Sequence, residues 1–125
     1  MSKESREKVW TNLEEAIEQR SFVFQLDLSR QGIRNIPESI GKLNKVMSCN
    51  LSGNDLDETC FPDEFWELSY LQELDLSHNH FRNLPPCICM FIDLKKLNIS
   101  GNDFEDVQHQ AKLITALFPD CTVTY

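Results

Sequence analysis

The sequence has 125 residues, of which 41% are hydrophobic and 26% are charged, a composition that predicts one ordinary globular domain and excludes a disordered or collagen-like polymer. Lys and Arg number 12 and Asp and Glu number 20, so the net charge is −8 at pH 7, which disfavours direct binding of nucleic acid and favours a partner protein with a basic surface. No apolar run approaches the ~20 residues of a membrane span, and the N-terminus lacks the apolar stretch of a secretory signal, so we expect no membrane contact.

The cysteines agree with an intracellular location. Their number is odd and their spacing is irregular, so a complete set of intrachain disulfides is impossible. Reduced thiols are the default in a chain without a secretory signal, and we expect the protein in the cytoplasm, with the nucleus as the alternative. The residues concerned are Cys49, Cys60, Cys87, Cys89 and Cys121.

The first predicted element is an amphipathic helix over about residues 3–19. One of its faces is apolar at helical spacing, and Lys, Arg and Glu fill the other. Because the sequence that follows is repetitive and a stack of repeats exposes its ends, we interpret residues 1–21 as a capping helix, and a mobile helix that binds a partner is the alternative. The apolar stripe consists of Val9, Trp10, Leu13, Ala16 and Ile17.

From residue 23 the sequence repeats itself. Apolar residues recur at relative positions 1, 4, 6, 11, 14, 18 and 21, in units that start at Val23, Val46, Leu71 and Leu94. The steps between these starts are 23, 25 and 23 residues. Positions 4 and 6 alternate as in a strand with one buried face. Position 9 carries an amide side chain that can bond the backbone groups a turn leaves unpaired, and it is occupied by Gln31, Asn54, Asn79 and Asn102.

These units resemble the leucine-rich repeat family, with its pattern L-x-x-L-x-L-x-x-N-x-L-x-x-L-P-x-x-I-x-x-L. The resemblance covers residues 23–104, and Pro37 and Pro85 at position 15 give it the Leu-Pro form of Ras-pathway scaffolds and plant-type intracellular members. It implies an α/β fold: a short right-handed solenoid with a curved parallel sheet, an N-terminal capping helix and a C-terminal helix-strand cap. It also implies non-enzymatic protein–protein contact, as in a signalling scaffold or a regulatory subunit of a phosphatase.

We therefore expect a single domain over residues 1–125, with about four repeats in residues 22–104 and a C-terminal cap in residues 105–125. Apolar residues between positions 107 and 118 predict a helix in that cap. Phe118, Cys121 and Val123 restart the 1-4-6 spacing, which predicts a fifth strand near Thr122. The altered fourth unit favours an end of the stack, and a fragment of a longer array is the alternative. The hydrophobic caps predict a monomer, and pairing of the C-terminal edge with a second copy is the alternative.

Outward-facing positions of the strands predict the binding surface. Positions 3, 5 and 8 of each unit face the concave side of such a sheet, and position 2 gives it a margin that runs from apolar, at Phe24 and Met47, to basic, at Lys95. We expect this rigid, mixed-polarity face to bind a partner protein or peptide, because its side chains are ordered before binding. The alternative is that its Asp and Asn residues are only soluble fillers of an exposed strand. The candidate residues are Phe24, Gln25, Asp27, Met47, Asn50, Glu73, Asp75 and His78.

A second candidate surface is the irregular segment between residues 54 and 68, which is rich in carboxylates and has no Lys or Arg. Trp66 stands one step off the core register, and an exposed Trp among acidic residues is typical of a binding hot spot for a basic partner. The alternative is a solvated convex loop with Trp66 flat on its neighbours. The candidate residues are Asp57, Glu58 and Trp66.

No pattern in the sequence indicates catalysis, a metal or a cofactor. Cys87-Ile88-Cys89 has no second ligand pair for zinc, and no glycine-rich nucleotide loop is present. Cys49 and Cys121 are expected in the core at position 4, whereas Cys60 is expected on the convex side with the other two thiols. Two alternatives to a binding module stay open: a redox- or metal-responsive protein that uses the convex cysteines, and an accessory protein of an RNA-processing complex.

Overall fold

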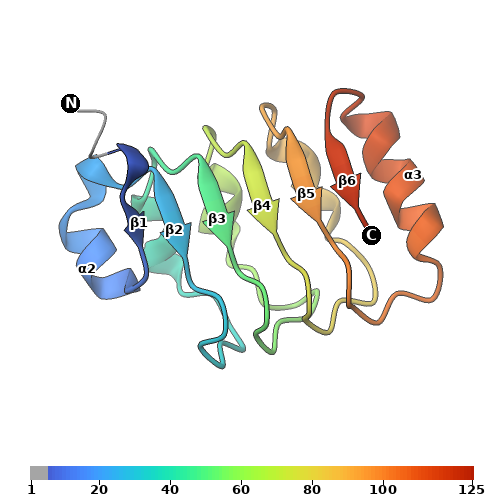
Figure 1. Ribbon diagram of the computed structural model, residues 1–125, viewed down its shortest axis with the longest axis horizontal. Coiled ribbons are helices and arrows are strands. Elements are labelled where there is room, and N and C mark those ends of the chain that lie inside the picture. Colours follow the sequence, from blue (N-terminus) through green and yellow to red (C-terminus); the bar gives the residue numbers. More distant parts are fainter. Residues whose placement is uncertain (1–5) are drawn as a thin grey trace.

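In the computed structural model, which describes residues 6–125, the strands form one parallel sheet in chain order from β1 to β6 (Figure 1). Equal positions of successive repeats lie side by side, because Gln25 pairs with Ser48, Ser48 with Glu73, and Glu73 with Lys96. The predicted α/β solenoid with a curved parallel sheet is confirmed. The strands are β1 (Val9–Trp10), β2 (Gln25–Asp27), β3 (Ser48–Asn50), β4 (Glu73–Asp75), β5 (Lys96–Asn98) and β6 (Thr122–Thr124).

Short 3-10 helices return the chain along the face opposite to the sheet. They are η2 (Glu38–Lys42), η3 (Asp63–Glu67) and η4 (Pro86–Met90), and each follows an extended proline. Proline suits that position because no ladder hydrogen bond needs its missing N–H. Each helix buries an apolar residue against the inner face of the strands, and these residues are Ile40, Phe65 and Ile88.

A ladder of asparagines joins the repeats at position 9, as the sequence predicts. The Asn54 Nδ2 donates to the backbone carbonyls of Leu28 and Leu51, both at 3.0 Å, so one side chain bridges two consecutive repeats. Its Oδ1 accepts two backbone N–H groups of the preceding turn, also at 3.0 Å. Asn102 forms the corresponding bonds two repeats later, and Asn79 forms both carbonyl bonds while its Oδ1 accepts the Leu56 N–H. The asparagines thereby satisfy backbone groups that the turns leave unpaired, beside the backbone bonds that join the same turns, such as Arg30 N–H to the Ser52 carbonyl and Gly53 N–H to the Ser77 carbonyl, both at 3.0 Å.

The N-terminal cap differs from the predicted helix over residues 3–19. Val9–Trp10 forms the strand β1, which extends the sheet beside β2, and the helix α2 covers only Leu13–Glu18. Asn12 separates the two elements because its Oδ1 accepts the N–H of Glu15 at 3.0 Å, a helix N-cap. A further 3-10 helix, η1 (Arg20–Phe22), leads into β2. Residues 3–5 of the predicted helix lie outside the described residues.

At the other end, the predicted helix and fifth repeat strand are both present. The helix α3 spans Val107–Leu117 and flanks the last strand, β6 (Figure 1). The predicted register of β6 is wrong by two residues, since Val123 and not Cys121 lies beside Leu97 at position 4. Cys121 instead belongs to the turn after α3, where its N–H bonds the Phe118 carbonyl at 2.9 Å, and the bonds to β5 begin with the Thr122 N–H on the Lys95 carbonyl at 2.8 Å. Cys121 is buried just before the strand.

Candidate functional site

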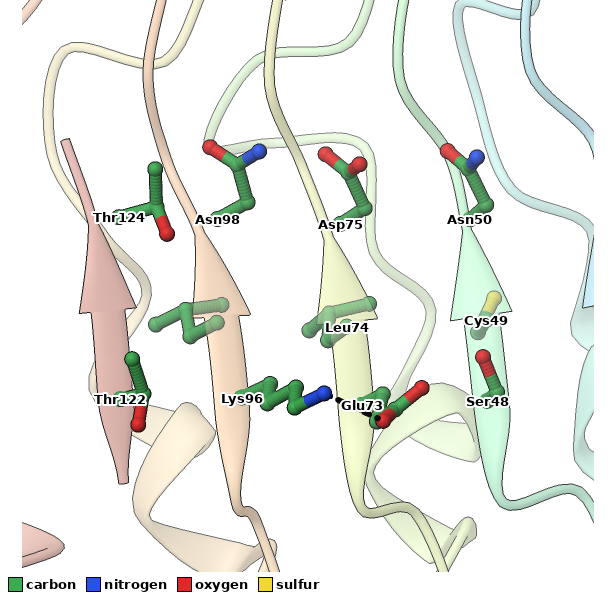
Figure 2. A pocket seen from close by; sticks show the side chains of 11 residues that line it. Ser48, Cys49, Asn50, Glu73, Leu74, Asp75, Lys96, Asn98, Thr122 and Thr124 are labelled. Atoms are coloured by element: carbon green, nitrogen blue, oxygen red, sulfur yellow. Dashed lines mark ion pairs between the residues drawn. The ribbon is translucent and has the colours of Figure 1, made fainter.

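The concave face of the sheet forms a shallow groove of about 330 Å³ across β3 to β6. Figure 2 shows its polar side chains in two rows, one at position 3 and one at position 5 of the repeats. The middle residue of each strand points the other way, into the core, so the outer residues of each strand face the solvent. The position-3 row is Ser48, Glu73, Lys96 and Thr122, and the position-5 row is Asn50, Asp75, Asn98 and Thr124.

The Asp and Asn side chains at position 5 are held in place by their own turns. In each of the first four repeats the Oδ1 accepts the backbone N–H two residues further on. The distance is 2.9 Å at Asp27, Asn50 and Asp75 and 3.1 Å at Asn98. Such Asx turns explain why short Asp or Asn side chains occupy this position, where a filler role had been the alternative. The donors are Ser29, Ser52, Ser77 and Ser100.

Position 3 carries one ion pair and one contact with the N-terminal segment. Lys96 Nζ and Glu73 Oε1 are 3.4 Å apart, and both side chains are about half exposed or more, so the pair contributes at most ~1 kcal/mol to stability. The Gln25 Nε2 donates to the Arg6 carbonyl at 2.9 Å, which fastens the chain before β1 to this end of the face. Glu73 and Lys96 therefore neutralise each other, and Gln25 is already engaged.

The apolar margin is smaller than the sequence predicts. Phe24 is only 9% exposed, and the Arg6 guanidinium lies 5.5 Å from the centroid of its ring, so Phe24 is not a free anchor for a partner. The reason is that Arg6, before β1, lies over the Phe24 ring, whereas the sequence predicted that this segment would form a helix covering the edge of the first repeat. Met47 is half-buried and borders the same hollow.

At position 8, large side chains lie against the glycine of the following repeat. Arg30 and His78 both have a φ of 56°, and they precede turns in which Gly53 and Gly101 have φ of 67° and 68°. A Cβ on Gly53 would approach Arg30 Cγ to 2.9 Å, and His78 packs still more closely against Gly101. Glycine is needed at both places for the close approach as well as for the backbone conformation. His78 is exposed at the edge of the concave face, as predicted.

The second candidate surface does not present an exposed tryptophan. Trp66 is 8% exposed, and its ring centroid lies 4.9 Å from that of Phe61, 5.3 Å from Phe65 and 5.4 Å from Phe91. The predicted hot spot at Trp66 is therefore wrong. The longer second unit brings Phe61 over the side chain, and the indole joins an aromatic cluster that fills the core of this repeat.

The two acidic residues proposed with Trp66 make local hydrogen bonds. The Asp57 Oδ1 accepts the Thr59 N–H at 2.8 Å and the Thr59 hydroxyl at 2.5 Å, and these bonds lower the pKa of the Asp57 carboxyl. The Glu58 Oε2 accepts the Arg82 N–H at 3.1 Å and so links two repeats. Both residues fix the shape of the turn, and they no longer surround an accessible aromatic ring.

The cysteines fall into a buried and an exposed group. Burial raises the pKa of the Cys49 thiol and that of the Cys60 thiol to about 12, so neither is a thiolate at neutral pH. Cys60 was expected on the convex surface but is 3% exposed, because it packs into the hydrophobic core. Cys87 and Cys89 are exposed, so of the three thiols predicted on the convex side only these two are accessible.

Several groove residues were not among the predicted site residues. The repeat register that places Glu73 and Asp75 on the groove also places Lys96 and Asn98 there, so the sequence held the signal for these two residues. Thr122 and Thr124 line the groove as well, but the spacing in the sequence put β6 two residues out of register.

Across the described residues, 6–125, no group of three or more His, Cys, Asp or Glu side chains is arranged to hold a metal ion. Within the same range, no helix has the length and apolar character needed to cross a membrane.

The sheet, the amide ladder and the 23–25-residue period define a repeat solenoid that displays a parallel sheet on one face. The family profile described as leucine rich repeat matches residues 15–81, and the profile described as leucine rich repeats in two copies matches residues 71–109. The chain belongs to the leucine-rich repeat family. Domains of the leucine-rich repeat family are generally protein–protein interaction modules and are typically non-enzymatic.

Solved structures share this fold. A leucine-rich repeat protein of Leptospira interrogans has 30% identity and a TM-score of 0.59, over 78% of this chain and 30% of that one. Internalin C2 of Listeria monocytogenes has 18% identity and a TM-score of 0.65, and the match covers 90% of this chain and 45% of internalin C2. A chain in the structure of the Chaetomium Mex67:Mtr2 subunits has 21% identity and a TM-score of 0.58, and the match covers 90% of this chain and 89% of that one. The chain thus spans less than half of the first two proteins. None of the curated proteins compared with it matches.

Proposed function

We propose that this chain is an adaptor or scaffold module that binds a partner protein on the concave face of β2 to β5. The observation that carries the proposal is the row of Asx turns at position 5. Asp27, Asn50, Asp75 and Asn98 are each oriented by a bond to their own turn before any partner arrives. Because these side chains are already ordered, a partner that binds them loses little of its affinity to side-chain entropy.

The acidic character of the chain supports a partner with a basic surface, since complementary charge speeds association and selects the partner. The described cysteines are all unpaired, which supports a reducing compartment, and we place the protein in the cytoplasm or the nucleus. We expect it to act as a monomer, with one partner per chain.

The proposal is tested with a pair of concave-face substitutions and a matched pair elsewhere. Ser48→Lys with Glu73→Lys adds two long cationic side chains to the β3–β4 side of the groove. Ser69→Lys with Glu67→Lys makes the same chemical changes outside the groove, at the exposed last residue of η3 and at the exposed Ser69 two positions later. Circular dichroism verifies that both variants fold.

Partners are captured from a lysate with the native chain and with each variant, and are identified by mass spectrometry. We expect the captured protein to be lost with the groove pair and retained with the matched pair. Retention by the groove pair would show that the concave face is not the binding surface.

A further inference from the structure

The position-5 side chains of the concave face keep one polar atom free for a partner, and what that partner must be rests on the proposed function. At position 5 each Asx turn uses Oδ1 alone, and among residues 6–125 no hydrogen bond engages the second polar atom of these side chains. That atom is a carboxylate oxygen at Asp27 and Asp75 and an amide nitrogen at Asn50 and Asn98. The row therefore alternates from strand to strand between an anionic acceptor and a neutral donor.

The two carboxylates are the uncompensated charges of the position-5 row, whereas the Arg6 guanidinium lies over Phe24, in the hollow that Gln25 and Glu73 of position 3 also line. Glu73 is paired with Lys96, as the dashed line in Figure 2 shows. Arg30, the nearest cation in sequence to Asp27, extends over Gly53 of the next repeat and forms no ion pair with Asp27 among the described residues. A ligand that covers the row thus meets two negative charges, separated by one amide.

The spacing of these groups is set by the sheet. Adjacent strands lie about 4.8 Å apart, so Asp27 on β2 and Asp75 on β4 are separated by about 9.6 Å across the strands. Asn50 on β3 lies midway between them. A partner segment that crosses the strands at right angles needs two cationic side chains at this interval on one side of its backbone.

The side-chain repeat distances of three regular backbone conformations can be compared with the interval of about 9.6 Å between Asp27 and Asp75. An extended β-strand repeats its side chains on one side every ~6.7 Å, which matches neither one strand spacing nor two. An α-helix places residues i and i+7 about 10.5 Å apart, but its carbonyls are already bonded and leave no acceptor for Asn50. Polyproline II repeats every three residues, about 9.3 Å, and its backbone carbonyls are free.

We propose that the concave face binds a basic protein segment in the polyproline II conformation, with Arg or Lys side chains three residues apart on Asp27 and Asp75. The Asn50 amide donates to a backbone carbonyl of the segment between the two cations. Charge-assisted bonds from the cations to the unused carboxylate oxygens supply most of the affinity, and the interval between Asp27 and Asp75 supplies the specificity.

The test uses three fluorescent peptides of identical composition, each with two Arg in a run of six Pro. The Arg residues stand two, three or four positions apart, and binding to the full chain is measured by fluorescence anisotropy at low ionic strength. We expect the peptide with Arg at i and i+3 to bind about 10-fold more tightly than either of the others, because only it reaches both carboxylates at once. Equal binding of the three peptides would overturn the proposal.

Two double variants locate the site without damaging the turns. Asp27→Asn with Asp75→Asn removes both charges but keeps the Oδ1 acceptor, as the native Asn50 and Asn98 show. We expect it to abolish the preference and most of the binding. Asp57→Asn with Asp93→Asn makes the same charge change at exposed residues outside the groove, and we expect it to leave the preference unchanged.

A third variant separates spacing from charge. Asn50→Asp with Asp75→Asn keeps the net charge and every turn acceptor, but brings the carboxylates to adjacent strands, about 4.8 Å apart. We expect it to lose the i, i+3 preference, and its retention would refute the role of the Asp27–Asp75 interval. If the peptides show no preference while the groove pair at Ser48 and Glu73 still abolishes partner capture, the proposed function stands and this inference fails.

Discussion

Replacement of Asn79 by alanine tests the role of the amide ladder in stability. Asn79 is 4% exposed, and its Oδ1 accepts the N–H of the fully buried Leu56 at 3.1 Å. That N–H has no other partner among the described residues, so the substitution leaves a buried donor unsatisfied. The carbonyls of Leu51 and Leu76 each keep a bond from the neighbouring asparagine. The orphaned donor and the lost bonds together give a cost of about 3 kcal/mol.

The assay is urea unfolding followed by circular dichroism. With a slope of about 2 kcal/mol/M, a loss of that size lowers the unfolding midpoint by about 1.5 M. Gln31→Ala is the control, because Gln31 holds the same repeat position at the exposed end of the ladder and its side chain makes a single bond, to the Thr11 carbonyl at 2.8 Å. We expect that control to cost at most ~1 kcal/mol. Equal midpoints for the two variants would refute the argument that Asn79 acts by satisfying a buried donor.

Three other predictions follow from burial and close approach. Trp66→Ala should lower the free energy of unfolding by about 3–5 kcal/mol, because the indole is buried against three phenylalanine rings, and an unchanged urea midpoint would contradict that placement. Gly101→Ala should destabilise the chain by about 1 kcal/mol or more, since Gly101 has a positive φ and His78 lies against it. Gly32→Ala is the control: Gly32 also has a positive φ, but an added Cβ there meets no neighbouring atom, so this variant tests the effect of φ alone. Alkylation at pH 8 should label two of the five cysteines in the folded chain and all five in urea, since a raised thiol pKa leaves the buried groups protonated. A third label on the folded chain, read by mass spectrometry, would contradict the burial. The two reactive residues are expected to be Cys87 and Cys89.

The repeat region could be predicted from the sequence because one signal is repeated four times. The spacing of Leu26, Cys49, Leu74 and Leu97 gives the buried residue of each strand, and the register of the concave face follows from it. The repeat spacing does not show which groups the outward-facing side chains hydrogen-bond. The serine two residues after each position-5 residue was visible in the sequence, but its part in an Asx turn depends on backbone geometry.

The ends of the chain were harder to predict because they depart from the period. Val9 and Trp10 fit a helical stripe by spacing, yet the N-cap at Asn12 and the open edge of β2 favour a strand. A similar ambiguity affected Trp66, whose place relative to the core register changes with the two-residue insertion. In both cases a neighbour outside the repeat pattern decides the conformation, and spacing alone carries no information about that neighbour.

The alternation of Arg30, Gly53, His78 and Gly101 at position 8 has a consequence for how the stack can be lengthened or shortened. Each large side chain lies over the glycine of the following repeat, so odd and even repeats are not interchangeable. Residues 23 and 71, like residues 46 and 94, are 48 positions apart because both intervals contain the 25-residue unit, whereas Glu73 and Thr122, at the same repeat position, are 49 apart. Removal of the second repeat would set Arg30 against His78, whereas insertion or removal of a whole pair preserves a glycine beside each large side chain. Chimeras and engineered longer arrays should therefore be joined so that each large residue at position 8 is followed by a repeat with glycine at that position.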